Sequence, residues 1–189
     1  MTEAPGRGAV SDWVKRWSHL VPPLGSVLDI ACGQGRHMAW LAQKGHAVTG
    51  IDRSSEATQA AAHFGKTILA DIENEPWPLM NGSHARQFDA VIVTNYLWRP
   101  LFPVITQSVA PGGILIYETF TQGNETVGKP SRPDFLLQPA ELLRTYADLR
   151  IIAFEEGFLE NPPRFVQRIA AERPDSRDTN AQTPTRYAL

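Results

Sequence analysis

The sequence contains very little cysteine, because Cys32 is the only one in 189 residues. A single cysteine cannot form a disulfide within the chain, so a reducing compartment is expected. Long apolar runs are also missing, and stretches such as Ile68-Leu69-Ala70 are far too short to span a bilayer. The opening residues, MTEAPGRGAV, lack the charged-then-apolar pattern of a secretory signal. These absences favour a cytoplasmic protein that has no membrane partner.

The sequence also lacks an excess of charge of either sign. It has 18 Lys and Arg residues against 20 Asp and Glu residues, which gives a formal net charge of −2. That balance provides no overall electrostatic footprint for nucleic acid or an anionic membrane, although a local basic patch is compatible with it. Hydrophobic residues make up 42% of the sequence, so we expect one globular domain with a sizeable core.

The hydrophobic pattern alternates between strands and helices through the middle of the chain. Strands are predicted at 27–31, 46–51, 67–70, 88–95 and 111–120, and helices at 36–44, 54–65 and 102–110. Such alternation is typical of a parallel sheet with right-handed crossovers and helices on both faces. The stretch 71–87 has two prolines near its start and is predicted to be mostly loop.

The two ends of the chain depart from this alternation. Residues 1–23 are predicted to form an N-terminal helical segment capped by Ser11, whose tryptophan stripe either packs on the main body or closes over a ligand. After a helix at 139–147, two strands at 149–159 and 164–172 are joined by ENPP. That connection is too short for a crossover helix and predicts an antiparallel hairpin. Residues 172–189 are polar and predicted to be disordered.

The stretch VLDIACGQGRHM predicts a ligand-binding turn between a buried strand and a helix. Gly33 and Gly35 permit positive φ and close approach of a ligand at the crevice where open α/β sheets bind dinucleotides or S-adenosylmethionine. A dinucleotide fingerprint requires a small residue where this chain has Met38. Asp29 would repel a diphosphate but would attract the ammonium of an amino-acid group. The chain is also too short to add a substrate domain. The turn therefore favours S-adenosylmethionine.

Two further carboxylates follow the next strands. Asp52 closes the second strand, where a carboxylate accepts hydrogen bonds from ribose hydroxyls, which both ligand classes possess. Asp71 and Ile72 follow the third strand, where an adenine amino group and ring face would lie. The alternative for Asp71 is a solvated loop residue or a helix cap.

Five segments together resemble the class I S-adenosylmethionine-dependent methyltransferases. They are VLDIACGQGR, the acidic end of VTGID, ADI, FDAVIVTNYL and APGGILIYE, in the order and spacing of that family over residues 24–171. The resemblance implies a Rossmann-like, doubly wound, seven-stranded and mostly parallel sheet with strand order 3-2-1-4-5-7-6 and an antiparallel last strand. Within the family, CGQGRH is most similar to the small tellurite-resistance-type methyltransferases.

The resemblance also implies a set of cofactor-binding residues. Asp29, Gly33 and Gly35 would hold the methionine part, Asp52 the ribose, and Asp71 with Ile72 the adenine. Thr94 and Asn95 would border the transferred methyl group. The backbone of Ala31 and Cys32 and the neighbouring Arg53 complete the expected set. No metal is expected.

The residues on the methyl-acceptor side are less clearly indicated. Tyr96 and Trp98 follow the fourth strand and either line an aromatic pocket or pack under the next helix. Prolines are absent there, so the Asn/Asp-Pro-Pro-Tyr/Phe motif of enzymes that methylate planar amines is not present. Arg99 either holds an anionic substrate or lies at the surface.

The insert at 120–138 is long for an α/β loop and is predicted to be a substrate-selecting cover, the alternative being a mobile connection. Glu118 stands at its mouth, and Lys129 and Arg132 within it hint at an anionic substrate. The catalytic residues stay unknown. Weak candidates are Tyr96, Glu118 and His37, and His37 is expected to be a packing residue more than a base.

The leading interpretation is a cytoplasmic methyltransferase that acts on a small molecule. Methylation of RNA or protein stays open, since four arginines lie on or after the last strand and could contact phosphates, namely Arg164, Arg168, Arg173 and Arg177. Acidic residues among them reduce the positive charge of that patch, and no auxiliary RNA-binding domain is seen. A catalytically silent, cofactor-binding regulatory subunit is a further alternative. A nicotinamide-dependent oxidoreductase is disfavoured by Met38 and Asp29. The sequence leaves the acceptor and the oligomeric state open.

Overall fold

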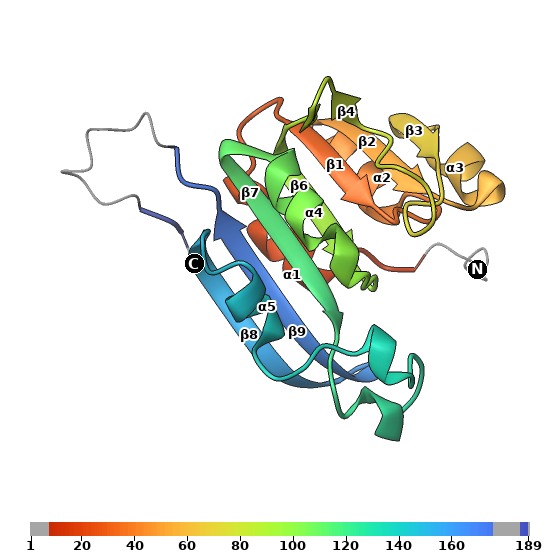
Figure 1. Cartoon of the computed structure of the whole chain (residues 1–189), viewed down its shortest axis with the longest axis vertical. Coiled ribbons are helices and arrows are strands. Elements are labelled where there is room, and N and C mark those ends of the chain that lie inside the picture. The colour runs from red at the N-terminus through yellow and green to blue at the C-terminus, as the bar shows by residue number, and fades with distance from the viewer. Residues whose placement is uncertain (1–7, 176–185, 189) are drawn as a thin grey trace.

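A computed structural model of the chain describes residues 8–175 and 186–188, and its centre is a seven-stranded sheet (Figure 1). The strand order is β3-β2-β1-β6-β7-β9-β8. Counted along the chain, these seven strands have the predicted order 3-2-1-4-5-7-6, and β9 is antiparallel to both neighbours, so the fold prediction is confirmed. Their bounds are Ser26–Ile30 (β1), Ala47–Asp52 (β2), Lys66–Leu69 (β3), Phe88–Thr94 (β6), Val109–Phe120 (β7), Arg150–Glu160 (β8) and Pro163–Glu172 (β9).

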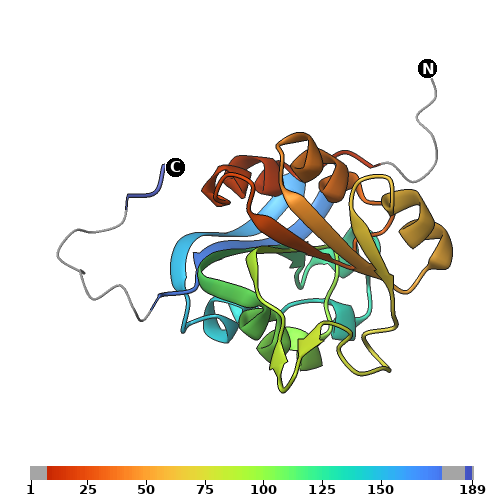
Figure 2. The ribbon, with the colours of Figure 1, turned by 90° about the horizontal axis from the view of Figure 1, so that it is seen from above.

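Helices cover both faces of the sheet, as Figure 2 shows. One face carries the side chains of β6 at Ala90 and Ile92, which pack in one cluster with residues of α1 and α2. The other face carries Val91 and Val93, which pack with residues of α4 and α5. The alternation follows from the two-residue period of a strand. The helices are Asp12–Trp17 (α1), Arg36–Gln43 (α2), Ser55–Ala61 (α3), Phe102–Ser108 (α4) and Glu141–Thr145 (α5).

The stretch 71–87 is more ordered than predicted. It contains a small antiparallel hairpin of β4 (Met80–Asn81) and β5 (His84–Ala85) that the sequence analysis did not predict, while the rest of the stretch is loop as predicted. The turn is Gly82-Ser83, and Gly82 has a φ of 62°. The Gly82-Ser83 dipeptide is a hairpin signal, because glycine provides the positive φ that a tight hairpin turn needs at its first central residue.

The N-terminal helix α1 packs into the core. The side chains of Trp13 and Trp17 are buried in the cluster on the α2 side of the sheet. The indole N–H of Trp13 donates to the Ile169 carbonyl on β9 at 3.1 Å, and the Ser11 hydroxyl caps the helix by accepting from the Trp13 and Val14 N–H groups. The tryptophan stripe is therefore packing surface, and its rings do not close over a ligand.

The predictions about membrane spans, cellular compartment and the C-terminal residues are tested only in part. Within the described residues, no helix is long and apolar enough to cross a membrane. The cytoplasmic location stays a prediction. The predicted disorder of residues 172–189 falls mostly on residues outside the described ones. Glu172 itself ends β9, and its carboxylate accepts a hydrogen bond from the Tyr187 hydroxyl.

Replacing Trp17 by alanine should destabilise the protein by about 3–5 kcal/mol, because the fully buried indole (0% exposed) leaves a cavity between α1 and the sheet. The measurement is the free energy of unfolding in urea. Leu69→Ala is the control, since Leu69 is 58% exposed and should change stability by no more than about 0.5 kcal/mol. A Trp17→Ala loss as small as that of the control would contradict the packing of α1 in the core.

Candidate functional site

Three adjoining cavities lie at the carboxyl ends of the parallel strands, and Asn95, directly after β6, lines all of them. Cavity A has a volume of about 310 Å³ and lies at the ends of β2 and β3. Cavity B, of about 240 Å³, surrounds the turn between β1 and α2. Cavity C, of about 500 Å³, is bounded by residues before α1, by the insert after β7 and by the β8–β9 connection. Ala31 joins A to B, and Arg36 joins B to C.

The glycine turn opens directly onto cavity B. Gly33 has a φ of 53°, and a Cβ atom built there would meet no atom within 4 Å, so the backbone faces open space. The Gly33 N–H donates to Asp52 Oδ2 at 2.8 Å, and the Ser54 N–H donates to Oδ1 at 2.9 Å. Asp52 therefore fixes the turn while each of its oxygens keeps a second lone pair for a ligand.

The bulky Met38 has a structural explanation. It packs from α2 against β2 at Gly50, and a Cβ atom at Gly50 would overlap the Met38 sulfur. The small residue needed for close helix–strand contact is thus supplied by the strand. The contact differs from the dinucleotide fingerprint, where the helix supplies it.

Asp29 carries a buried carboxylate whose two oxygens have no hydrogen-bond partner. The residue is 1% exposed on β1 and lies 4.0 Å behind the ring of His37, which lines cavity B. Burial raises the pKa of Asp29 to about 7, against the lowering effect of Arg36 and with a further increase from Asp52. An unpaired buried carboxylate is costly, and a cationic group bound beside it would offset that cost. Asp29 is not among the residues that line cavities A to C, but its charge favours an ammonium in the adjoining cavity B.

His37 links the N-terminal segment to the glycine turn. Its Nε2 accepts the Ser11 backbone N–H at 3.2 Å, and its Nδ1 lies 3.4 Å from the Thr94 hydroxyl. Burial, with the nearby Arg36, lowers the pKa of His37 to about 3. The ring is neutral at physiological pH, and the nitrogen that could accept a proton is already bonded to Ser11. This environment is that of a packing and positioning residue.

Cavity A is lined by residues at the end of β2 and directly after β2 and β3. Asp52, Arg53, Asp71 and Ile72 line it together, as the resemblance implied. Asp71 accepts a hydrogen bond from the Asn74 amide at 2.9 Å, and this bond is the main cause that lowers its pKa. Asp71 is therefore ionised at neutral pH and can accept from an amino group.

Tyr96 also lies on cavity A, and it does not line the larger cavity C. Its hydroxyl is buried, and burial, with Glu73 nearby, raises the pKa of Tyr96. A phenol with a raised pKa stays protonated at neutral pH, so it is poorly suited to act as a base. Its ring is placed to contact the ligand of cavity A.

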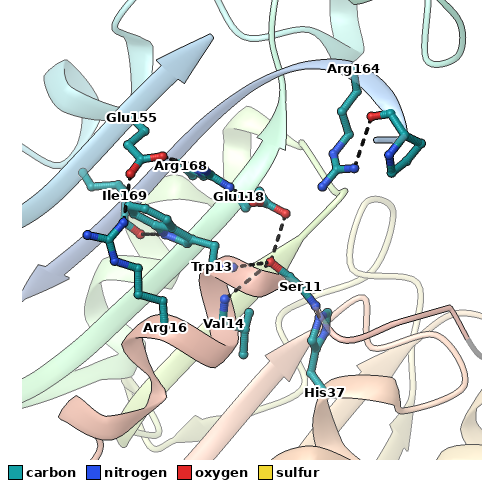
Figure 3. A network of polar contacts seen from close by, with 11 residues as sticks. Ser11, Trp13, Val14, Arg16, His37, Glu118, Glu155, Arg164, Arg168 and Ile169 are labelled. Atoms are coloured by element: carbon teal, nitrogen blue, oxygen red, sulfur yellow. Dashed lines mark hydrogen bonds and ion pairs between the residues drawn. The ribbon is translucent and has the colours of Figure 1, made fainter. Parts of the chain in front are cut away.

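Glu118 lies on the wall of cavity C within a chain of polar contacts (Figure 3). Its Oε1 accepts the Ser11 hydroxyl at 3.0 Å, and its Oε2 lies 3.3 Å from Arg168 Nη1. The chain continues from Arg168 to Glu155 and from Glu155 to Arg16 on α1. Glu118 therefore joins the N-terminal segment to β9 and is balanced by a cation.

Three predicted acceptor-side residues lie away from the cavities. Arg99 pairs with Glu141 on α5 at 2.7 Å and donates to carbonyl groups of the insert. Trp98 is half-buried and packs against the core cluster that includes Val91 and Val93. Arg132 is exposed and pairs with Asp134. None of the three lines cavity A, B or C.

The structure adds two arginines that the sequence analysis did not assign to a small-molecule site. Arg36 lines cavities B and C, and Arg164, considered earlier only as a contact for RNA, lines cavity C from the start of β9. The insert contributes to the walls of A and C, and its role in selecting the substrate stays a prediction. Its lining residues are Phe120, Asn124, Gly128, Lys129, Pro130 and Phe135. Arg36 could have been noticed from its place directly after the glycine turn.

Comparison with known proteins identifies the domain. Residues 27–113 match the family described as "Methyltransferase domain". The putative methyltransferase YqeM of Bacillus subtilis is 30% identical over 62% of this chain and 50% of its own length. A ubiquinone biosynthesis O-methyltransferase of Psychrobacter cryohalolentis is 31% identical over 51% of this chain and 41% of its own length. The crystal structure of TehB from Haemophilus influenzae has a similar fold, with a TM-score of 0.71, 20% identity, and coverage of 87% of this chain and 62% of that chain.

The sheet order is that of the class I S-adenosylmethionine-dependent methyltransferase fold, and the match over residues 27–113 is to a methyltransferase domain. The likeness to TehB is a likeness of fold, and the narrower resemblance to small tellurite-resistance-type methyltransferases stays a prediction. The chain spans about half the length of the curated relatives it matches.

Asp29→Asn should stabilise the ligand-free protein at pH 8 by about 2 kcal/mol more than at pH 5. The folded-state pKa of Asp29, about 7, is raised from the ordinary value of 3.8, so the unfolded chain ionises Asp29 at a lower pH than the folded chain does. The free energy of unfolding of the wild-type protein therefore falls as the pH rises from about 3.8 to about 7. The neutral amide of the variant does not ionise, so the variant does not show this fall. Urea unfolding at the two pH values provides the measurement.

Asp148→Asn, at an exposed position outside the cavities, should show no comparable pH-dependent gain. An Asp29→Asn gain that is equal at pH 5 and pH 8 would show that the carboxylate is not held in an unfavourable environment.

Proposed function

We propose that the chain binds S-adenosylmethionine and transfers its methyl group to a small-molecule acceptor. The observation that carries the proposal is the buried, unpaired carboxylate of Asp29 behind the glycine turn. It matches the ammonium of the methionine part, whereas the diphosphate that a dinucleotide would place at this turn carries charge of the same sign as Asp29.

The residues of cavities A and B would hold the cofactor from its two ends. Asp29 would bind the ammonium, and Arg36, at the junction of cavities B and C, would bind the carboxylate of the same amino-acid group. Asp52 would accept from the ribose hydroxyls with the lone pairs that Gly33 and Ser54 leave unused.

The adenine would lie in cavity A. Asp71 would accept from its exocyclic amino group, while Ile72 and Tyr96 contact the ring. Thr94 ends β6 and lines cavity B, and Asn95 directly after it lines both cavities, so these two residues would lie where the two ends of the cofactor meet.

A sulfonium cofactor supplies an electrophilic methyl group, so the chain has to position the acceptor and exclude water. Neither of the polar candidates nearest the acceptor has the properties of a base. His37 is neutral with a lowered pKa, and Glu118 is bound by Ser11 and Arg168. The proposed acceptor therefore reacts through an atom that is nucleophilic without a protein base, such as a thiolate.

The wild-type chain should bind S-adenosylmethionine and S-adenosylhomocysteine in isothermal titration and should not bind NAD. Asp52→Ala should weaken S-adenosylhomocysteine binding by about 1–3 kcal/mol, the cost of losing hydrogen bonds to a charged group. Asp148→Ala is the matched control and should leave the affinity unchanged. Tight binding of NAD, or an unchanged affinity in Asp52→Ala, would refute the assignment.

Transfer of a labelled methyl group should separate the acceptor classes. With cell extract as the source of acceptors, the label should enter the small-molecule fraction, because cavity C, at about 500 Å³, has the size of a small-ligand site. Heat-denatured chain is the control. Label confined to RNA or protein would show that the acceptor is a macromolecule, and binding of cofactor without transfer to any fraction would favour a regulatory role.

A further inference from the structure

Cavity C carries more positive charge than its own acids neutralise. Five ionisable groups line it, namely Asp12, Arg36, Glu118, Lys129 and Arg164. The two acids are paired with cations outside the cavity wall. Asp12 lies 3.2 Å from Lys15, and Glu118 lies 3.3 Å from Arg168. The three cations of the wall take part in no ion pair among the described residues, so the cavity has an uncompensated positive charge.

Arg164 has the donors to bind an anion. Its one hydrogen bond within the described residues is a 3.5 Å contact from Nη1 to the Pro162 carbonyl, so most of its donors are unused. Figure 3 shows the side chain extending from β9 toward the side of the cavity where Ser11 and Glu118 lie. A guanidinium presents its N–H groups in a planar fork that matches carboxylate and phosphate oxygens.

The like charges of Arg164 and Arg36 act on each other across the cavity. Burial lowers the pKa of Arg36 and Arg164 adds to this effect, while Asp29 and Glu118 oppose it. Two cations that repel each other beside a water-accessible space form an arrangement that a bound anion would stabilise.

Resting on the proposed function, we infer that the methyl acceptor carries an anionic oxygen group, a carboxylate or a phosphate, held by Arg164 and Lys129 in cavity C. Of the three cavities, these two residues line only cavity C, whereas Arg36 also lines cavity B, where the methionine part is proposed to bind. Arg36 is thereby available to the cofactor's carboxylate, and the other two cations to the acceptor. Phe120 and the prolines of the β8–β9 connection give the same cavity an apolar wall for the rest of the acceptor.

The test uses the full chain loaded with S-adenosylhomocysteine and three probes of similar shape: benzoate, phenylphosphonate and the neutral benzamide. In titration calorimetry, at least one anion should bind about tenfold more tightly than benzamide. The anion with the higher affinity distinguishes a carboxylate from a phosphate group.

Arg164→Gln should weaken binding of the preferred anion about tenfold, and Lys129→Gln about threefold because that ammonium is exposed. Both variants should keep the wild-type affinities for benzamide and S-adenosylhomocysteine. Arg150→Gln is the matched control, because Arg150 is exposed at the opposite end of the β8–β9 hairpin, and it should leave every affinity unchanged.

Equal binding of benzamide and the anions, or an equal loss in Arg150→Gln and Arg164→Gln, would overturn the inference. Displacement of the probes by a short single-stranded RNA that binds more tightly than either anion would overturn it in favour of a nucleic-acid acceptor. A chain that fails to bind S-adenosylhomocysteine would contradict the proposed cofactor. The probes are then titrated into the cofactor-free chain, where loss of anion preference in Arg164→Gln supports the anion site and an unchanged preference overturns it.

Discussion

The hydrogen bond from the Gly33 N–H to Asp52 is the interaction on which the candidate site depends. It ties the turn after β1 to the end of β2, and the parallel pairing of these strands brings the two residues to the same edge of the sheet. With the turn fixed, the Gly33 backbone faces open space, and cavities A and B share the wall at Ala31. One carboxylate thus shapes the backbone and remains available to a ligand.

At the same edge of the sheet, the buried carboxylate of Asp29 destabilises the folded protein. A carboxylate without hydrogen bonds in the core opposes folding at neutral pH, and its raised pKa expresses that opposition. The rest of the sheet supplies the stability to tolerate it, through apolar strands packed on both faces by helices. Unfavourable groups retained in a well-packed core are characteristic of binding sites, because the ligand provides the missing interaction.

Sequence reasoning reached the sheet order because it depends on local patterns, and the same patterns gave the expected cofactor residues, whose role stays a prediction. Buried β-branched strands, glycine turns and a carboxylate at a strand end are each readable within a few residues, as in the segment from Asp29 to Asp52. The β4–β5 hairpin was missed although Gly82-Ser83 signals it, because the nearby prolines favoured a loop. Trp98 and Arg99 were placed by sequence adjacency to β6, whereas the helical turn after Trp98 directs Arg99 to Glu141 on α5.

The acceptor side could not be predicted in the same way, because its wall comes from three segments far apart in the sequence. Residues before α1, the insert and the β8–β9 connection meet at cavity C, and Ser11 joins the first of them to His37 and Glu118. The sequence offered Arg164 only as one of several arginines that could contact RNA, and this tertiary contact makes it a candidate for binding a small molecule in cavity C. Since these segments differ from those proposed to hold the cofactor, substitutions in them would change the acceptor while the turn at Gly33 and Asp52 keeps its geometry. On the proposed function, the sheet would therefore determine the donor, and the loops added to it would determine what is methylated.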